Sequence, residues 1–211
     1  MKQSIAILVG TLVGSGCASA KLAAAGAVTI EVYTKLDPTV TLSGSVLTAA
    51  EFQASYLLRE AGIRLEWRRG QPARWEPGSI GLTFVPQAPE TFRCPEKRSA
   101  LASARPFGSG TAITVYTDRV QAYIEPYPDR QAAMILGHIF AHEIVHVLEG
   151  EARHSETGLM KASWSHADLW TMTRDHLRLA AEDLDILQSR FAFIPAAAPT
   201  SSVLPLATAF R

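Results

Sequence analysis

Cysteine is scarce in this sequence, and the two cysteines that occur lie far apart, at Cys17 and Cys94. If an amino-terminal segment is removed after Ala20, only Cys94 remains. An intramolecular disulfide is then excluded. The chain also lacks an excess of either charge, since Lys+Arg and Asp+Glu both number 20. This balance gives no sign of a basic surface, so we expect no nucleic-acid partner.

Internal repeats are absent as well, which argues against a solenoid or another repeat architecture. Residues 194–211 consist of Ile194 and the sequence PAAAPTSSVLPLATAFR. This segment is rich in alanine, proline and serine, so we expect a disordered tail there. Residues 27–193 have a length that suits one domain with a sizeable core. We therefore expect a single domain between an amino-terminal segment and a tail.

The amino-terminal segment has the three parts of a signal peptide. A basic start at Lys2 is followed by an apolar stretch over 5–13 and by Ala-Ser-Ala at 18–20. The apolar stretch is too short for a stable transmembrane helix. Residues 1–20 are thus predicted to be a signal peptide, and the mature protein to be secreted or periplasmic. The alternative is lipoprotein processing at Cys17, the one case in which we expect a membrane association.

Histidine is missing from the first 137 residues, and all six histidines lie between His138 and His176. Two of them frame the run His142-Glu143-Ile144-Val145-His146. Residues four apart lie one turn apart on the same face of a helix, so both imidazoles can reach one metal ion. The glutamate between them can then act on a water molecule at the metal without being a ligand. H-E-x-x-H predicts zinc-dependent hydrolysis of a peptide or related amide bond, with Glu143 as the general base.

The motif lies within a long apolar segment, DRQAAMILGHIFAHEIVHVL, at 129–148. Pro128 and Asp129 are start signals for a helix, and Gly150 is a stop signal. Because apolar residues cover most of its circumference, we expect a buried central helix. Histidines and a glutamate inside such a helix are costly unless something satisfies them, and a zinc ion would do so.

A catalytic zinc site usually has three protein ligands and an open position. His154 is the preferred third ligand, and it can reach the metal only if the chain reverses at Gly150, which tolerates positive φ. His166 and Glu149 are the alternatives, although we expect Glu149 to cap the helix end in solvent. We predict one Zn²⁺ per chain. A core histidine with internal hydrogen bonds is the favoured interpretation of His138.

The run HEIVHVLEGEARHSETGLM resembles the active-site segment of the metzincin zinc endopeptidases, and is closest to their matrixin-like pattern with H-S followed by L-M. The resemblance implies that His142, His146 and His154 bind zinc, that Glu143 is the base, and that Met160 belongs to a turn beneath the metal. The spacing here is H-E-x-x-H-x-x-x-G-x-x-x-H, two residues longer than the metzincin motif. The segment is also similar to small bacterial exported proteins with H-E-x-x-H, a glycine, H-S and G-[LI]-M.

The rest of the chain predicts an α+β fold of zincin or metzincin type. We expect a mixed twisted sheet, the central metal-binding helix, a methionine-containing turn and a carboxy-terminal helix. A capping box from Thr48 to Glu51 is predicted to open a helix that ends near Gly62. The expected strands are 28–33, 63–67, 80–85 and 111–120, and the expected closing helix is 179–191.

The last expected strand is a candidate substrate-binding strand. In the zincin arrangement it lies along the cleft, and an exposed edge there can pair with an extended peptide. Ile113, Val115 and Thr117 are the candidate residues. The alternative is an ordinary strand of the sheet.

These features together predict an exported zinc metallopeptidase, and more specifically an endopeptidase, that acts on a peptide or protein substrate. The runner-up is a non-catalytic exported protein with a structural zinc site. A third reading is a helical envelope-binding domain in which the motif occurs by chance. The presence of Glu143 favours the enzyme, because a structural site has no use for a base.

Overall fold

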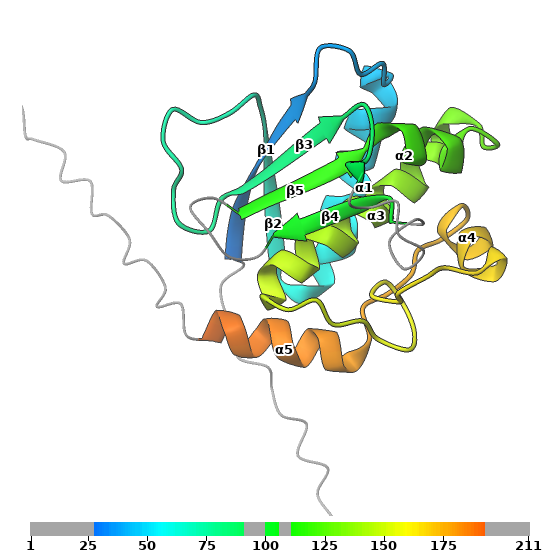
Figure 1. The fold of residues 1–211 in the computed structure, drawn as a ribbon. Coiled ribbons are helices and arrows are strands. Elements are labelled where there is room, and N and C mark those ends of the chain that lie inside the picture. Colours follow the sequence, from blue (N-terminus) through cyan, green and yellow to red (C-terminus); the bar gives the residue numbers. More distant parts are fainter. Residues whose placement is uncertain (1–27, 91–99, 106–110, 193–211) are drawn as a thin grey trace, which may run out of the picture.

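A computed structural model describes residues 28–90, 100–105 and 111–192 (Figure 1). The predicted signal peptide, both cysteines and the predicted tail lie outside the described residues. The elements follow in the order β1 (Val28–Leu36), α1 (Gly44–Leu58), a 3₁₀ turn η1 (Arg59–Ala61), β2 (Ile63–Arg69), β3 (Ile80–Val85), β4 (Ala102–Arg105), β5 (Thr111–Tyr116), α2 (Thr117–Ile124), α3 (Asp129–Glu149), α4 (His166–Met172) and α5 (Ala181–Ala192).

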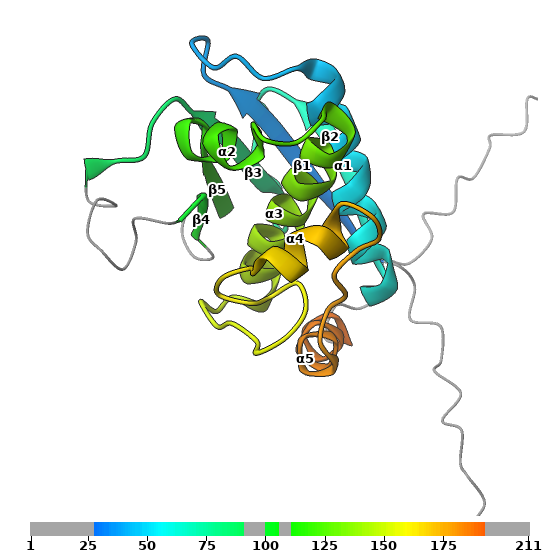
Figure 2. The ribbon, with the colours of Figure 1, turned by 90° about the vertical axis from the view of Figure 1, so that its right-hand side faces the viewer.

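The strands form one five-stranded sheet in the order β2-β1-β3-β5-β4. β2, β1, β3 and β5 are parallel to one another, whereas β4 is antiparallel to β5. Helices α1 and α3 lie side by side against one face of the sheet (Figure 2). The predicted fold class is confirmed: a mixed sheet, a central helix that carries the histidines, and a carboxy-terminal helix.

Helix α3 is long and apolar enough to cross a membrane by length and composition, but 78% of its most apolar window is buried inside the domain. Ile135, Leu136, Phe140 and Ile144 are among its fully buried side chains. Phe140 contacts Phe84 of β3 edge to face, with ring centroids 5.7 Å apart. The apolar character of α3 therefore serves the core, as its sequence predicts.

The prediction that the strand beginning at Thr111 forms an exposed edge is wrong. β5 lies between β3 and β4, and both Ile113 and Val115 are fully buried. The strand also ends earlier than expected, since Thr117 is the first residue of α2. The edge of the described sheet on this side is β4, whose sequence ASAR contains none of the β-branched or aromatic residues that would reveal a strand.

The predicted capping box at Thr48 is also wrong, because α1 begins at Gly44 with Ser43 at the N-cap. Glu51 is instead buried in the second turn of the helix. It accepts a hydrogen bond from the Thr34 hydroxyl (3.1 Å) and pairs with both terminal nitrogens of Arg69. This carboxylate joins α1 to β1 and β2, so its role is set by tertiary contacts and not by the helix terminus.

Candidate metal centre

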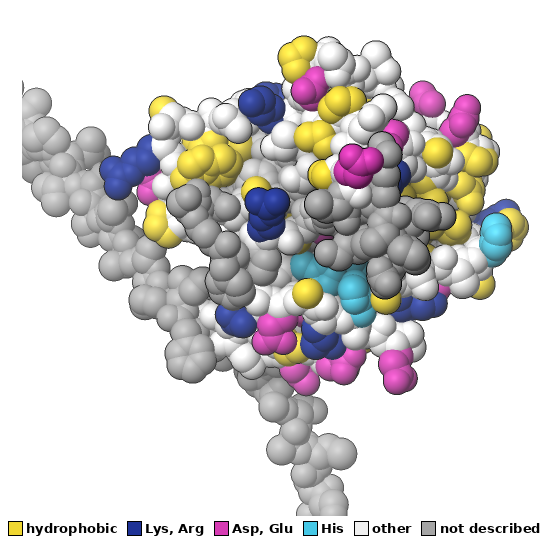
Figure 3. Space-filling model, in the orientation of Figure 1, with side chains coloured by type: hydrophobic (Ala, Val, Ile, Leu, Met, Phe, Trp, Pro, Cys, Tyr) yellow, Lys and Arg dark blue, Asp and Glu magenta, His cyan; other side chains and the backbone are white. Residues whose placement is uncertain are grey.

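The structure brings three histidines together at one end of α3. His142 and His146 lie one turn apart on the helix, and His154 follows in the loop after it. One ligand nitrogen from each ring lies within 4.8 Å of the other two. Gly150 adopts φ +68° at the helix end, so the chain reverses where the sequence predicts. Histidine side chains reach the surface near the middle of the face shown in Figure 3.

Hydrogen bonds fix the tautomers of the two helical histidines. The Nδ1–H of His142 donates to the carbonyl of Leu159 (2.9 Å), and the Nδ1–H of His146 donates to that of Glu151 (3.2 Å). A carbonyl oxygen only accepts, so in a neutral ring the proton must be on Nδ1 and the Nε2 atom carries a free lone pair. Both rings are buried, and burial is the main cause that lowers the pKa of His142 to about 3 and that of His146 to about 4. Both are therefore neutral at pH 7.

The two unprotonated Nε2 atoms of His142 and His146 are only 3.0 Å apart. Two lone pairs that face each other at this distance cannot form a hydrogen bond, and they repel unless a cation lies between them. Two nitrogen ligands at about 2.0–2.1 Å from a tetrahedral zinc ion lie roughly 3.3 Å apart. The observed separation is close to that value, so the donor set fits zinc.

The other candidate ligands lie elsewhere. His166 is the exposed first residue of α4 and is outside the histidine group. The expectation that Glu149 points into solvent is wrong: its side chain is 1% exposed and faces Arg153 at 3.5 Å. Burial raises the pKa of Glu149 to about 7. Neither residue joins the three histidines.

Glu143 lines a cavity of about 360 Å³ together with His142 and His154. Burial raises the pKa of the Glu143 carboxyl to about 7. The wall opposite α3 includes Trp164, whose ring meets that of His142 edge to face at 5.4 Å between centroids. Trp164 therefore forms part of the cavity wall beside His142.

The methionine turn lies next to His142, which hydrogen-bonds to its Leu159 carbonyl. Met160 is fully buried, and its carbonyl accepts a hydrogen bond from the backbone N–H of Ser155 (2.8 Å). The preceding residue, Leu159, supplies the carbonyl that orients His142. Gly158 has φ +74°, and a Cβ there would lie 2.3 Å from the carbonyl oxygen of Arg178. Glycine is thus required for this turn to pack against the segment that precedes α5.

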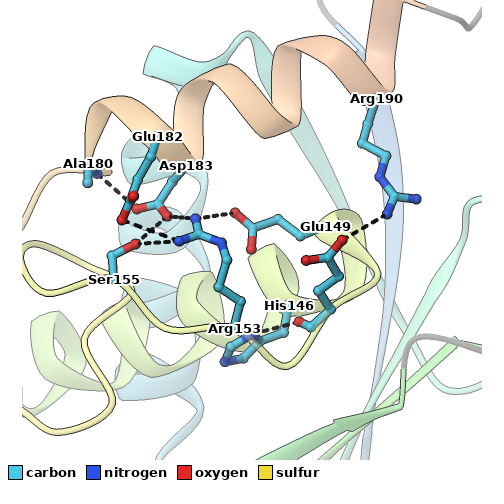
Figure 4. A network of polar contacts seen from close by, with 9 residues as sticks. His146, Glu149, Arg153, Ser155, Ala180, Glu182, Asp183 and Arg190 are labelled. Carbon is cyan, nitrogen blue, oxygen red and sulfur yellow. Dashed lines mark hydrogen bonds and ion pairs between the residues drawn. The ribbon is translucent and has the colours of Figure 1, made fainter.

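Sequence reasoning missed a cluster of charged residues next to the third histidine (Figure 4). Arg153 of the loop contacts Asp183 and Glu182 of α5 and faces Glu149 of α3. Asp183 is fully buried and also accepts a hydrogen bond from the Ser155 hydroxyl (2.6 Å). No local pattern marks these residues, because they are ordinary charged side chains that only the fold brings together.

His138 is a core histidine, as predicted. Its Nδ1–H donates to the carbonyl of Met134 (2.7 Å), and its Nε2 accepts from the backbone N–H of Leu177 (3.1 Å). The residue therefore ties α3 to the segment between α4 and α5. Burial is the main cause that lowers the pKa of His138 to about 4.

This depressed pKa predicts a pH-dependent stability. The unfolded chain binds a proton at His138 near pH 6.5, whereas the folded protein does so only near pH 4. Unfolding therefore takes up a proton between these values, and the contribution of His138 to the free energy of unfolding falls by about 3 kcal/mol as the pH drops from 6.5 to 4. His138→Gln keeps one donor and one acceptor but does not titrate. Urea unfolding in chelator should show a shallower acid dependence for this variant, and parallel curves would contradict the assignment.

Comparison with known proteins gives little beyond this geometry. No protein-family model matches the sequence, and no curated protein matches it. Among solved structures, the crystal structure of an archaemetzincin from Methanopyrus kandleri is similar to 80% of this chain and 98% of that one. The sequence identity is 15% and the TM-score is 0.45. Both values are low, so this similarity does not identify the chemistry of the site.

Proposed function

We propose that the protein is an exported, zinc-dependent metallopeptidase. The observation that carries this proposal is the pair of unprotonated Nε2 atoms of His142 and His146, 3.0 Å apart, with a nitrogen of His154 within 4.8 Å. Three neutral imidazoles around one point form a nitrogen donor set that zinc prefers. When bound, a zinc ion supplies Lewis acidity, which lowers the pKa of a coordinated water and polarises a carbonyl oxygen.

Glu143 is the proposed general acid and base. It lies next to a proposed ligand in the sequence and lines the same cavity. As a carboxylate it takes a proton from the attacking water. The resulting carboxylic acid then gives that proton to the nitrogen of the departing amine, so the proton count balances over one hydrolysis. Burial raises the pKa of this carboxyl in the metal-free site, which favours the uptake of a proton.

The substrate edge is proposed to be β4 in place of β5. β4 is the last strand of the described sheet, and Ala102, its first residue, lines the same cavity as Glu143. An extended peptide that pairs with this edge would lie across the histidines and could continue in both directions. This arrangement supports cleavage within a chain, and hence an endopeptidase. The signal-peptide features of residues 1–20 support export.

The open cavity and the base favour an enzyme over the non-catalytic alternative. A structural zinc site is closed by four protein ligands. Among the residues that the structure describes, the group has three members, and one of them, His154, is exposed. Such a site leaves a position for water and substrate.

Metal analysis of the purified protein tests the proposal. We expect one zinc ion per chain in the wild type and a weakened or lost ion in His154→Ala. His166→Ala is the matched control, because His166 is an exposed histidine outside the group, and it should keep its zinc. Wild-type protein that holds no zinc after reconstitution would refute the proposal. Loss in His166→Ala with retention in His154→Ala would refute the ligand set.

A further inference from the structure

The three histidines are not held in the same way. His142 and His146 each donate a hydrogen bond from Nδ1 to a backbone carbonyl. Within the described part of the chain, the ring of His154 has no such bond, and its contacts are the neighbouring rings, with centroids 5.4 Å and 4.9 Å away. The position of His154 must therefore come from the backbone on either side of it.

Both neighbours of His154 are anchored to the same carboxylate. The Ser155 hydroxyl donates to Asp183 Oδ1 (2.6 Å), and Arg153 Nη2 contacts the same oxygen. Arg153 Nη1 also donates to the Ser155 hydroxyl (3.2 Å). Arg153, Ser155 and Asp183 therefore all contact one another, on both sides of the His154 backbone. Asp183 itself is held by the backbone N–H of Ala180 through its second oxygen (3.0 Å). A fixed point at the start of α5 thus holds the loop on both sides of His154.

Arg153 also links this point to the end of α3. Its Nη2 lies 3.5 Å from Glu149 Oε1, so one guanidinium stands between two carboxylates that are 1% and 0% exposed. Figure 4 shows Arg153 between Glu149 on one side and Asp183 with Ser155 on the other. Buried carboxylates are costly without a cation, and the planar fork of arginine can contact several oxygens at once.

We propose that Arg153 is a positioning residue that holds His154 at the metal site by clamping the loop between α3 and α5. The inference rests on the proposed zinc site. The loop from His146 to His154 is two residues longer than in the metzincin motif, and the clamp restricts that extra length. Changes to groups that orient metal ligands commonly weaken metal binding by about 10–100-fold.

The test is a double-mutant cycle on zinc affinity with the full chain. Zinc dissociation constants are measured by chelator competition for Arg153→Met, His154→Ala and the double variant. We expect Arg153→Met to weaken binding about 10–100-fold when His154 is present and to have no further effect in His154→Ala. Arg190→Met is the matched control, because Arg190 pairs with Glu151 of the same loop at 3.8 Å and is half exposed. It should leave the affinity unchanged.

Urea unfolding without metal separates positioning from stability. If Arg153→Met fails to fold, Arg153→Lys takes its place in the cycle, since it keeps the charge but loses the fork. We then expect a smaller loss that again requires His154. If Arg153→Met weakens zinc binding equally with and without His154, the positioning role of Arg153 is refuted. The same holds if the variant is less stable but binds zinc with unchanged affinity. Either result would leave the proposed zinc site standing. Absence of zinc in the wild type would instead refute the proposed function.

Discussion

Glu143→Gln is expected to lower the rate of peptide hydrolysis by about 10²–10⁴-fold while one zinc ion stays bound. Glutamine matches glutamate in shape, so the helix and the cavity should be preserved. It cannot take a proton from water or carry one to the departing nitrogen, which removes the proposed proton transfer. Glu143 is outside the group of possible metal ligands, so the zinc content should not change.

The measurement is kcat/KM on an unstructured peptide, together with zinc content, for both proteins. Glu156→Gln is a suitable control, because Glu156 is an exposed glutamate in the turn that follows His154. This substitution makes the same chemical change outside the cavity. Its rate should equal that of the wild type. If Glu143→Gln stays as active as the wild type, the base lies elsewhere. If neither protein hydrolyses any peptide while both hold zinc, the structural-zinc alternative gains support.

The central helix and its histidines could be predicted because their information is local. An apolar segment with a stop signal at Gly150 defines α3, and the four-residue spacing of His142 and His146 follows from the helical period. The position of His154 needed one further step, a chain reversal at a glycine with positive φ. These inferences use neighbouring residues only, and the structure confirms that the three rings meet.

The sheet edge and the clamp could not be predicted, because they depend on partners far along the chain. β4 is a short segment without β-branched or aromatic residues, and it is defined by its pairing with β5. Arg153 and Asp183 are 30 residues apart, and no periodicity connects them. Glu149 is a similar case. Its place at the end of a helix predicts a solvent-exposed cap, but in the folded protein it is buried and faces Arg153. Long-range packing thus decides which strand lies at the edge of the described sheet and what anchors the loop on both sides of His154.

Removing zinc is expected to lower the free energy of unfolding by about 4 kcal/mol at a free zinc concentration near 1,000 times the dissociation constant. For a domain of this size the melting temperature should fall by roughly 8–16 °C. Relief of the repulsion between the lone pairs of His142 and His146, 3.0 Å apart in the metal-free site, is already part of the zinc affinity that sets this loss. Thermal unfolding with and without chelator measures the shift, and His154→Ala should show a smaller one.

The size of this shift in melting temperature distinguishes the three interpretations of the H-E-x-x-H motif: a catalytic zinc site, a structural zinc site and a chance occurrence. The core of α1, α3 and the sheet is built from apolar side chains that do not touch the histidines, such as Val32, Leu58 and Leu82. The metal-free protein should therefore remain folded and melt cooperatively, as a catalytic site predicts. A structural zinc site predicts unfolding on chelation at room temperature. A chance motif predicts a melting temperature that is indifferent to chelator, and that result would remove both the enzyme and the zinc.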